Sequence, residues 1–140
     1  MSGGSAVRPF VFQARVYYED TDLGGVVYYA NYLRFLERAR TEWLLAQGIS
    51  QTALLETEGL LFAITRVDIR YVKPARFEDR LAITVELVRR RRASMEFRQR
   101  IHRGGEEGEL LCTAEVSAAC LEAGSLRPRA IPAHLFAEGD

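Results

Sequence analysis

Hydrophobic and polar residues alternate over residues 10–16, as in a strand with one buried face. Over residues 28–48 the hydrophobic positions instead recur every three or four residues, with charged residues between them. This spacing predicts one long amphipathic helix that ends near Gly48. A shorter helix is expected from Ser50, its N-cap, to about residue 58.

Alternation returns in the second half of the chain. It covers residues 66–71, 81–87, 95–101 and 112–120, with a turn expected over residues 73–79. Hairpin-length connections among these four strands predict antiparallel pairing. A single long helix must then cover the apolar face of the sheet, so the predicted fold class is α+β.

Composition narrows the class of protein. The 140 residues suit one domain, expected over residues 9–140 after a flexible tail of residues 1–8. Lysine plus arginine equals aspartate plus glutamate at 19 each, which argues against nucleic acid as a partner. No apolar run is long enough for membrane insertion and the start lacks a secretory signal, so a cytoplasmic location is expected. Cys112 and Cys120 lack metal-ligand spacing and are expected to be buried thiols.

Candidate chemistry lies where the first strand meets the long helix. The stretch "VYYEDTDLGGVVYYANYLRFLERARTEWL", residues 16–44, places Asp20, Asp22, Gly24 and Gly25 at this junction. An aspartate just before a helix often forms an Asx-turn or an N-cap, with no chemistry at all. The junction therefore needs a further signal before either aspartate is assigned a function.

The same stretch resembles the signature of the hotdog-fold 4-hydroxybenzoyl-CoA thioesterase family, and in particular its branch of short-chain acyl-CoA thioesterases associated with the Tol-Pal system. "YVKPARFEDRL" and "RPRAIP" extend the resemblance, which runs from about Phe12 to Pro132. It implies a five-stranded antiparallel sheet wrapped around one long helix. It also implies sheets paired edge to edge in a dimer, or in a tetramer of such dimers, with active sites shared between subunits. The implied reaction is hydrolysis of an acyl-CoA thioester with no metal or other cofactor.

Three residues take roles from this resemblance. Asp22 matches the catalytic carboxylate, and Tyr18 matches a tyrosine that lines the site in the branch named above. Tyr29 stands where that branch often has a histidine. With a tyrosine at this position, the chain resembles the 4-hydroxybenzoyl-CoA thioesterases themselves. Asp20 is the less favoured acid, and Tyr28 and Tyr32 are expected in the core.

The chemistry of thioester hydrolysis agrees with this assignment. It needs a carboxylate that attacks the carbonyl or deprotonates water, and donors that stabilise the oxyanion. Asp22 can supply the first, and unpaired N–H groups over residues 27–29, from Val27 to Tyr29, can supply the second. Gly24 and Gly25 would let the backbone turn sharply and let a bulky substrate approach.

The run Arg89, Arg90, Arg91 and Arg92 offers two interpretations. It can be a solvated hairpin, or it can bind the phosphates of coenzyme A through forked guanidinium donors.

Two competing functions remain open at this stage. A hydratase of acyl thioesters would be expected to use a histidine, and both histidines lie far from the motif. A non-catalytic module that binds acyl-CoA or an acyl carrier protein would bind substrate without releasing thiol. An acyl carrier protein is accordingly a second candidate partner.

Overall fold

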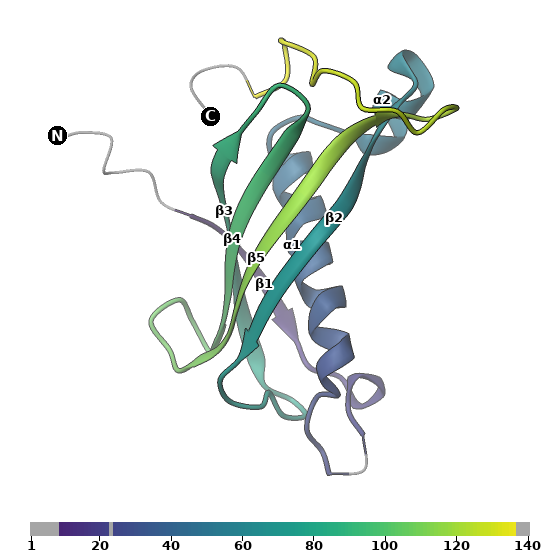
Figure 1. Cartoon of the computed structure of the whole chain (residues 1–140). Helices are drawn as coiled ribbons and strands as arrows, with labels where there is room; N and C mark the ends of the chain where they lie inside the picture. The colour runs from purple at the N-terminus through teal and green to yellow at the C-terminus, as the bar shows by residue number, and fades with distance from the viewer. Residues whose placement is uncertain (1–8, 23, 137–140) are drawn as a thin grey trace, which may run out of the picture.

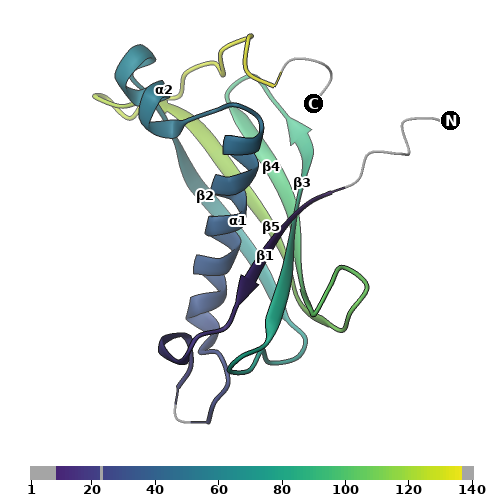
Figure 2. The same cartoon turned by 180° about the vertical axis from the view of Figure 1, so that it is seen from behind.

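The computed structural model describes residues 9–22 and 24–136 of the chain (Figure 1). The expected tail of residues 1–8 lies outside the described residues. The elements, in chain order, are β1 (Phe10–Arg15), η2 (Tyr18–Asp20), η3 (Tyr29–Asn31), α1 (Tyr32–Ala46), α2 (Gln51–Glu58), β2 (Leu60–Tyr71), β3 (Arg80–Arg90), β4 (Ser94–Arg103) and β5 (Leu110–Glu122). This is the expected α+β hotdog fold, in which five antiparallel strands curve around one long helix (Figure 2).

The order of strands in the sheet is β1-β3-β4-β5-β2. The short connection between β2 and β3 predicted that these two strands pair, but they do not. The partner of β2 is β5, with Leu60 opposite Glu122. The reason lies in the connection, because Ala75 accepts the N–H of Val27 at 2.8 Å and thus binds the loop before the helix. The connection crosses the end of the sheet, and β2 becomes its far edge.

The long helix begins later than the aromatic pattern suggested. A 3-10 turn, η3, precedes α1, which starts at Tyr32. The predicted end is confirmed, since Gly48 adopts φ +83° just after α1. The second helix is confirmed as well, with the Ser50 hydroxyl accepting the N–H of Ala53 at 3.1 Å.

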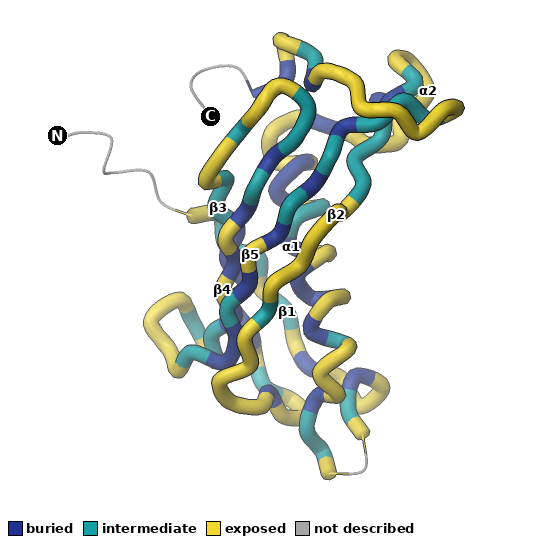
Figure 3. The backbone as a smooth tube through the Cα atoms, in the orientation of Figure 1, coloured by how far each residue is buried: buried dark blue, intermediate teal, exposed yellow. Residues whose placement is uncertain are grey.

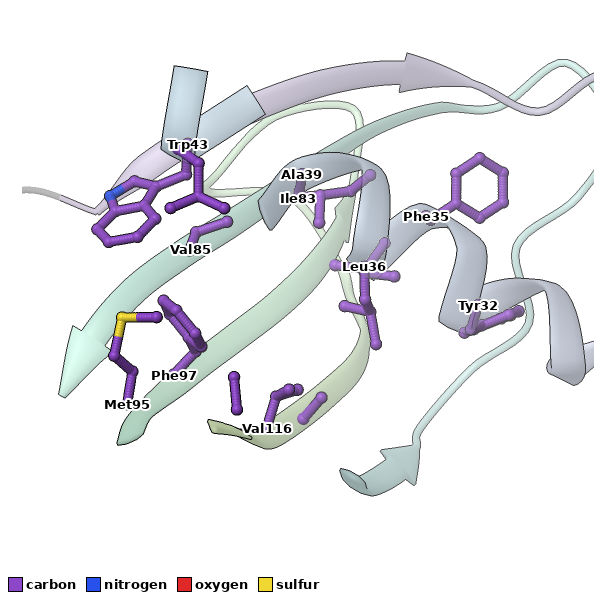
Figure 4. Close-up of a cluster of buried hydrophobic side chains, with 14 of the residues drawn as sticks. Tyr32, Phe35, Leu36, Ala39, Trp43, Ile83, Val85, Met95, Phe97 and Val116 are labelled. Carbon is purple, nitrogen blue, oxygen red and sulfur yellow. The ribbon is translucent and has the colours of Figure 1, made fainter. Parts of the chain in front are cut away.

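One face of α1 packs against β1 and β3 (Figure 4). Its buried residues are Tyr32, Phe35, Leu36, Ala39, Trp43 and Leu44. They meet inward-facing residues of the strands such as Ile83, Val85, Met95, Phe97 and Val116. By contrast, β2 is exposed along much of its length (Figure 3). Among the described residues, no helix is both long and apolar enough to cross a membrane.

Candidate active site

The junction between β1 and α1 is built around Asp20. Its side chain is only 7% exposed, and its Oδ2 atom accepts the N–H of Tyr17 at 2.9 Å, which closes the short η2 turn. Its carbonyl oxygen accepts a hydrogen bond from the Asn31 side chain at 2.9 Å. Asp20 thus connects the loop to the start of the helix, and its role is structural.

Asp22 lies on the surface of the same loop. Its Oδ1 atom accepts the N–H of Gly24 at 3.1 Å, and among the described residues no other donor contacts this carboxylate. The loop turns back on itself because the Asp22 N–H donates to Val26 and Gly25 adopts φ +75°. The turn leaves one carboxylate oxygen of Asp22 free for a substrate or a water molecule.

Backbone donors occur where η3 begins. The first N–H groups of a 3-10 turn have no acceptor within the turn. Among the described residues, the N–H groups of Tyr29 and Ala30 have no hydrogen-bond partner. The N–H of Val27 is different, because it donates to the Ala75 carbonyl at 2.8 Å. Val27 is therefore not the free donor that the sequence suggested.

A pocket of about 400 Å³ joins these groups. It is lined by Asp22, Val26, Val27, Tyr28, Tyr29, Tyr32, Tyr71, Val72, Lys73 and Pro74. Its walls are mainly apolar, so they can contact the apolar part of a substrate.

Four tyrosines form the wall of this pocket. The ring of Tyr71 lies 5.2 Å from that of Tyr29 and 5.3 Å from that of Tyr32, and Tyr28 stacks on Tyr29 at 5.5 Å. The Tyr71 hydroxyl donates to the Tyr29 carbonyl at 3.2 Å. Burial raises the pKa of Tyr71 and of Tyr32, so both phenols stay protonated at neutral pH. Tyr32 is in the core as expected, but Tyr28 is 53% exposed, and the core prediction for it is wrong.

Lys73 brings a positive charge to the edge of the pocket. Its Nζ atom lies 2.9 Å from Glu109, which also contacts Arg103 at 3.1 Å. These hydrogen bonds, first from Lys73 and then from Arg103, lower the pKa of the Glu109 carboxyl. Sequence reasoning assigned neither Tyr71 nor Lys73 a role in the site, although the "YVKP" stretch that contains both was part of the family resemblance.

Other residues expected in the site lie outside this pocket. Tyr18 is 77% exposed and packs edge-on against the ring of Phe77, with the centroids 5.8 Å apart. Gly24 and Gly25 do not line the pocket either. They shape the turn that carries Asp22, and a Cβ at Gly25 would meet no atom within 4 Å, so its positive φ is the requirement.

The arginine run lies at the other end of the chain's fold, far from the Asp22 loop (Figure 1). Arg80 begins β3 near the Asp22 loop, and Arg90 ends it about 33 Å away at the usual rise of a strand. There Arg89 and Arg91 face Glu96 at 3.9 and 3.7 Å, and Arg90 donates to the Phe136 carbonyl at 2.7 Å. Residues 89–92 therefore do not reach the pocket of their own chain.

Two further hollows, of about 290 and 380 Å³, lie on the outward face of the sheet. They are lined mostly by arginine, glutamate and other polar side chains, and neither contains Asp22. Within the described ranges, no group of three or more His, Cys, Asp or Glu side chains is arranged to hold a metal ion. The pocket with Asp22 is thus the strongest candidate for the active site.

Comparison with known proteins gives a consistent result. The thioesterase-like superfamily model matches residues 16–138. Acyl-CoA thioester hydrolase YbgC of Escherichia coli is 44% identical over 129 residues, which cover 92% of this chain and 94% of that protein. Acyl-CoA thioesterase YbgC of Haemophilus influenzae is 42% identical over 88% of each chain.

Solved structures agree with the sequence relatives. The crystal structure of "Probable Thioesterase from Bartonella henselae" superposes with a TM-score of 0.82 at 38% identity, and it covers 89% of this chain and 100% of that one. Fold and sequence together identify the family: the chain belongs to the thioesterase-like superfamily.

Proposed function

We propose that this protein hydrolyses acyl-CoA thioesters to a free acid and coenzyme A, with Asp22 as the catalytic carboxylate. One observation carries the proposal: a carboxylate with a free oxygen and the unpaired N–H of Tyr29 border the same apolar pocket. The names of the YbgC relatives support acyl-CoA as the substrate class.

The geometry supports a short reaction sequence. The thioester carbonyl enters the pocket with its oxygen toward the N–H of Tyr29, which stabilises the negative charge that develops there. Asp22 either attacks the carbonyl carbon itself or removes a proton from a water molecule that attacks it. The C–S bond then breaks, and the electron pair leaves with sulfur as a thiolate. Attack by water gives the carboxylic acid directly, whereas attack by Asp22 gives a mixed anhydride, which a water molecule hydrolyses to the acid and the free Asp22 carboxylate.

Tyr29 in place of a histidine is compatible with this sequence of steps. The thiol of coenzyme A resembles that of cysteine, whose pKa is about 8.5. It can therefore leave as a thiolate without first receiving a proton from an acid. The imidazole is thus dispensable for departure of the leaving group. We propose that Tyr29 acts through its backbone N–H and that its ring contacts the acyl group.

A dimer is part of the proposal. β2 pairs with β5 on one side, and its other side is an open edge of the described sheet. Long open edges are usually covered, and a second copy of the chain can pair with β2 in antiparallel fashion. Such pairing sets the Leu60 end of one β2 beside the Tyr71 end of the other. Residues 89–92, which share the Leu60 end, would then serve the partner's pocket by binding coenzyme A phosphates.

A cytoplasmic location is also proposed. Cys112 and Cys120 are free and buried, and burial raises the pKa of the Cys112 thiol to about 12. Unpaired cysteines of this kind suit a reducing compartment.

The test measures thiol release from a panel of acyl-CoA esters, from acetyl to palmitoyl with benzoyl and 4-hydroxybenzoyl added. Asp22→Asn keeps the shape of the side chain and removes its charge, so turnover should fall at least about 100-fold. Asp20→Asn is the matched control, because the amide oxygen can still accept the Tyr17 N–H and turnover should persist.

Each result has a clear meaning. Full activity in Asp22→Asn would remove this residue from the mechanism. Saturable binding without thiol release from any ester, including an acyl group carried on acyl carrier protein, would favour the binding-module alternative. A single turnover in ¹⁸O-labelled water separates the two roles of Asp22, since only direct attack incorporates label into its carboxylate.

A further inference from the structure

Arg40 is a partly buried cation without an acidic partner. Its Nη1 atom donates to the Gln99 side-chain oxygen at 2.9 Å, and Gln99 is fully buried with its amide nitrogen bonded to the Leu36 carbonyl at 3.1 Å. Among the described residues, no carboxylate forms an ion pair with Arg40. Burial lowers the pKa of its guanidinium, and the charge of Glu37 offsets only part of this effect. A buried charge is costly unless an opposite charge accompanies it.

Glu37 is an acidic residue close to Arg40 on the same helix, yet among the described residues the two form no ion pair. It lies three positions before Arg40, where side chains on a helix can meet. Its carboxylate instead accepts the Thr41 hydroxyl at 2.8 Å and is exposed to solvent. α1 therefore presents Glu37 and Arg40 side by side on one face, and their charges are not paired with each other.

This face borders an uncovered apolar surface. Arg40 and Glu37 line a hollow of about 150 Å³ between α1 and β2, with Phe62, Ile64 and Phe97 among its apolar walls. Ile64 is 45% exposed, although it lies on the inner side of the sheet beside this hollow. An exposed apolar surface of this kind is typical of an interface.

We infer that a second copy of this chain covers this surface and that its Glu37 forms the ion pair with Arg40. This inference rests on the proposed dimer. In a twofold dimer every contact occurs twice, so Glu37 of each protomer would meet Arg40 of the other. The two residues lie about 4.5 Å apart along the axis of α1, which lets two antiparallel helices satisfy both pairs at once.

The position of the hollow supports this arrangement. Ile64 lies near the middle of β2, and Arg40 lies near the middle of α1, yet both line the same space. A twofold axis near the middle of the β2 edge therefore also passes near the middle of α1. The same twofold axis would therefore relate both the two paired β2 strands and the two Glu37–Arg40 ion pairs.

Charge reversal tests the inference by sedimentation equilibrium. Arg40→Glu and Glu37→Arg each place like charges together, so each should raise the dimer dissociation constant by about 30-fold or more. The double variant Glu37→Arg/Arg40→Glu restores opposite charges and should return it to within about threefold of the parent. Arg38→Glu is the matched control, because Arg38 lies on another side of α1, over the Phe35 ring at 5.5 Å.

The outcomes separate the inference from the proposals on which it rests. If the unaltered protein sediments as a monomer, the dimer itself is wrong. If it is a dimer and both single reversals leave the dissociation constant unchanged, the Glu37–Arg40 pairing is wrong and the dimer stands. Loss of association in both single variants without recovery in the double variant also overturns the pairing. None of these measurements depends on turnover, so a failure of the thioesterase proposal remains distinguishable.

Discussion

Aromatic rings gather near both ends of α1, but the two groups differ in how far they are exposed. At the tryptophan end, Trp43, Phe97 and Phe136 are at most 6% exposed, and Trp43 packs on the two phenylalanines with centroids 5.3 and 5.4 Å apart. At the tyrosine end, Tyr29 is 63% and Tyr71 44% exposed, although their rings also touch.

The difference lies in how tightly the rings at each end are packed. Close packing at the tryptophan end removes large aromatic surfaces from water, which is the dominant source of folding free energy. The tyrosine end gives up part of that stabilisation and keeps a pocket with open N–H groups beside Asp22. Aromatic rings that line a cavity and remain partly exposed therefore indicate a binding function.

The largest expected effect on stability comes from removing the Trp43 side chain from the tryptophan end. Trp43→Ala should lower the free energy of unfolding by about 3–5 kcal/mol, because it leaves a cavity between Phe97 and Phe136. Tyr29→Ala should lower it by less than about 1 kcal/mol, because most of that ring is already in water. Urea unfolding at one fixed protein concentration measures both. Similar losses in the two variants would contradict the division between the ends.

A smaller effect is expected when one hydroxyl is removed from the tyrosine end. Tyr71 donates to the Tyr29 carbonyl at 3.2 Å. The bond therefore helps to hold the turn that presents the N–H of Tyr29, the proposed oxyanion donor, to the pocket. Tyr71→Phe should reduce kcat about fivefold, since one hydrogen bond contributes roughly 1 kcal/mol, while KM stays nearly constant.

Tyr18→Phe makes the same chemical change outside the pocket and is the matched control. Because Tyr18 packs on Phe77 and does not line the pocket, its hydroxyl should be dispensable for turnover. A loss of kcat in Tyr18→Phe comparable to that in Tyr71→Phe would support the role that the family resemblance assigned to Tyr18. It would also mean that the site extends beyond this pocket.

Sequence predicted the parts of the fold that depend on local periodicity. α1, α2 and the alternating strands follow from spacing and from caps such as Ser50. The strand order did not follow, because the partner of β2 is decided by where residues 72–79 cross the sheet. That crossing depends on hydrogen bonds to a distant loop, such as the one from Val27 to Ala75, which no local pattern records.

The site divides in the same way. Asp22 and its turn were found because they are contiguous in sequence and match a family motif. Tyr71 and Lys73 come from the end of an edge strand and reach the pocket only through the tertiary fold. The exposure of Tyr28 was missed because the sequence does not show that a 3-10 turn separates this residue from the helix.

The smallest expected effect concerns the ion pairs of Glu109 with Lys73 and Arg103 near the tyrosine end. Glu109 binds Lys73 and Arg103, and its lowered pKa means that the folded state favours its charged form. Its contribution to stability is therefore present above the unfolded pKa of about 4.5, and it is lost as the pH falls through the lower folded value. Glu109→Gln should unfold at a slightly lower temperature than the parent at neutral pH, and the difference should vanish in acid and shrink in high salt.

Since the tryptophan end is held by packing, Phe97→Leu should instead keep its lower unfolding temperature at every pH. A difference for Glu109→Gln that persisted below about pH 3 would mean that Glu109 stabilises this end by packing as well.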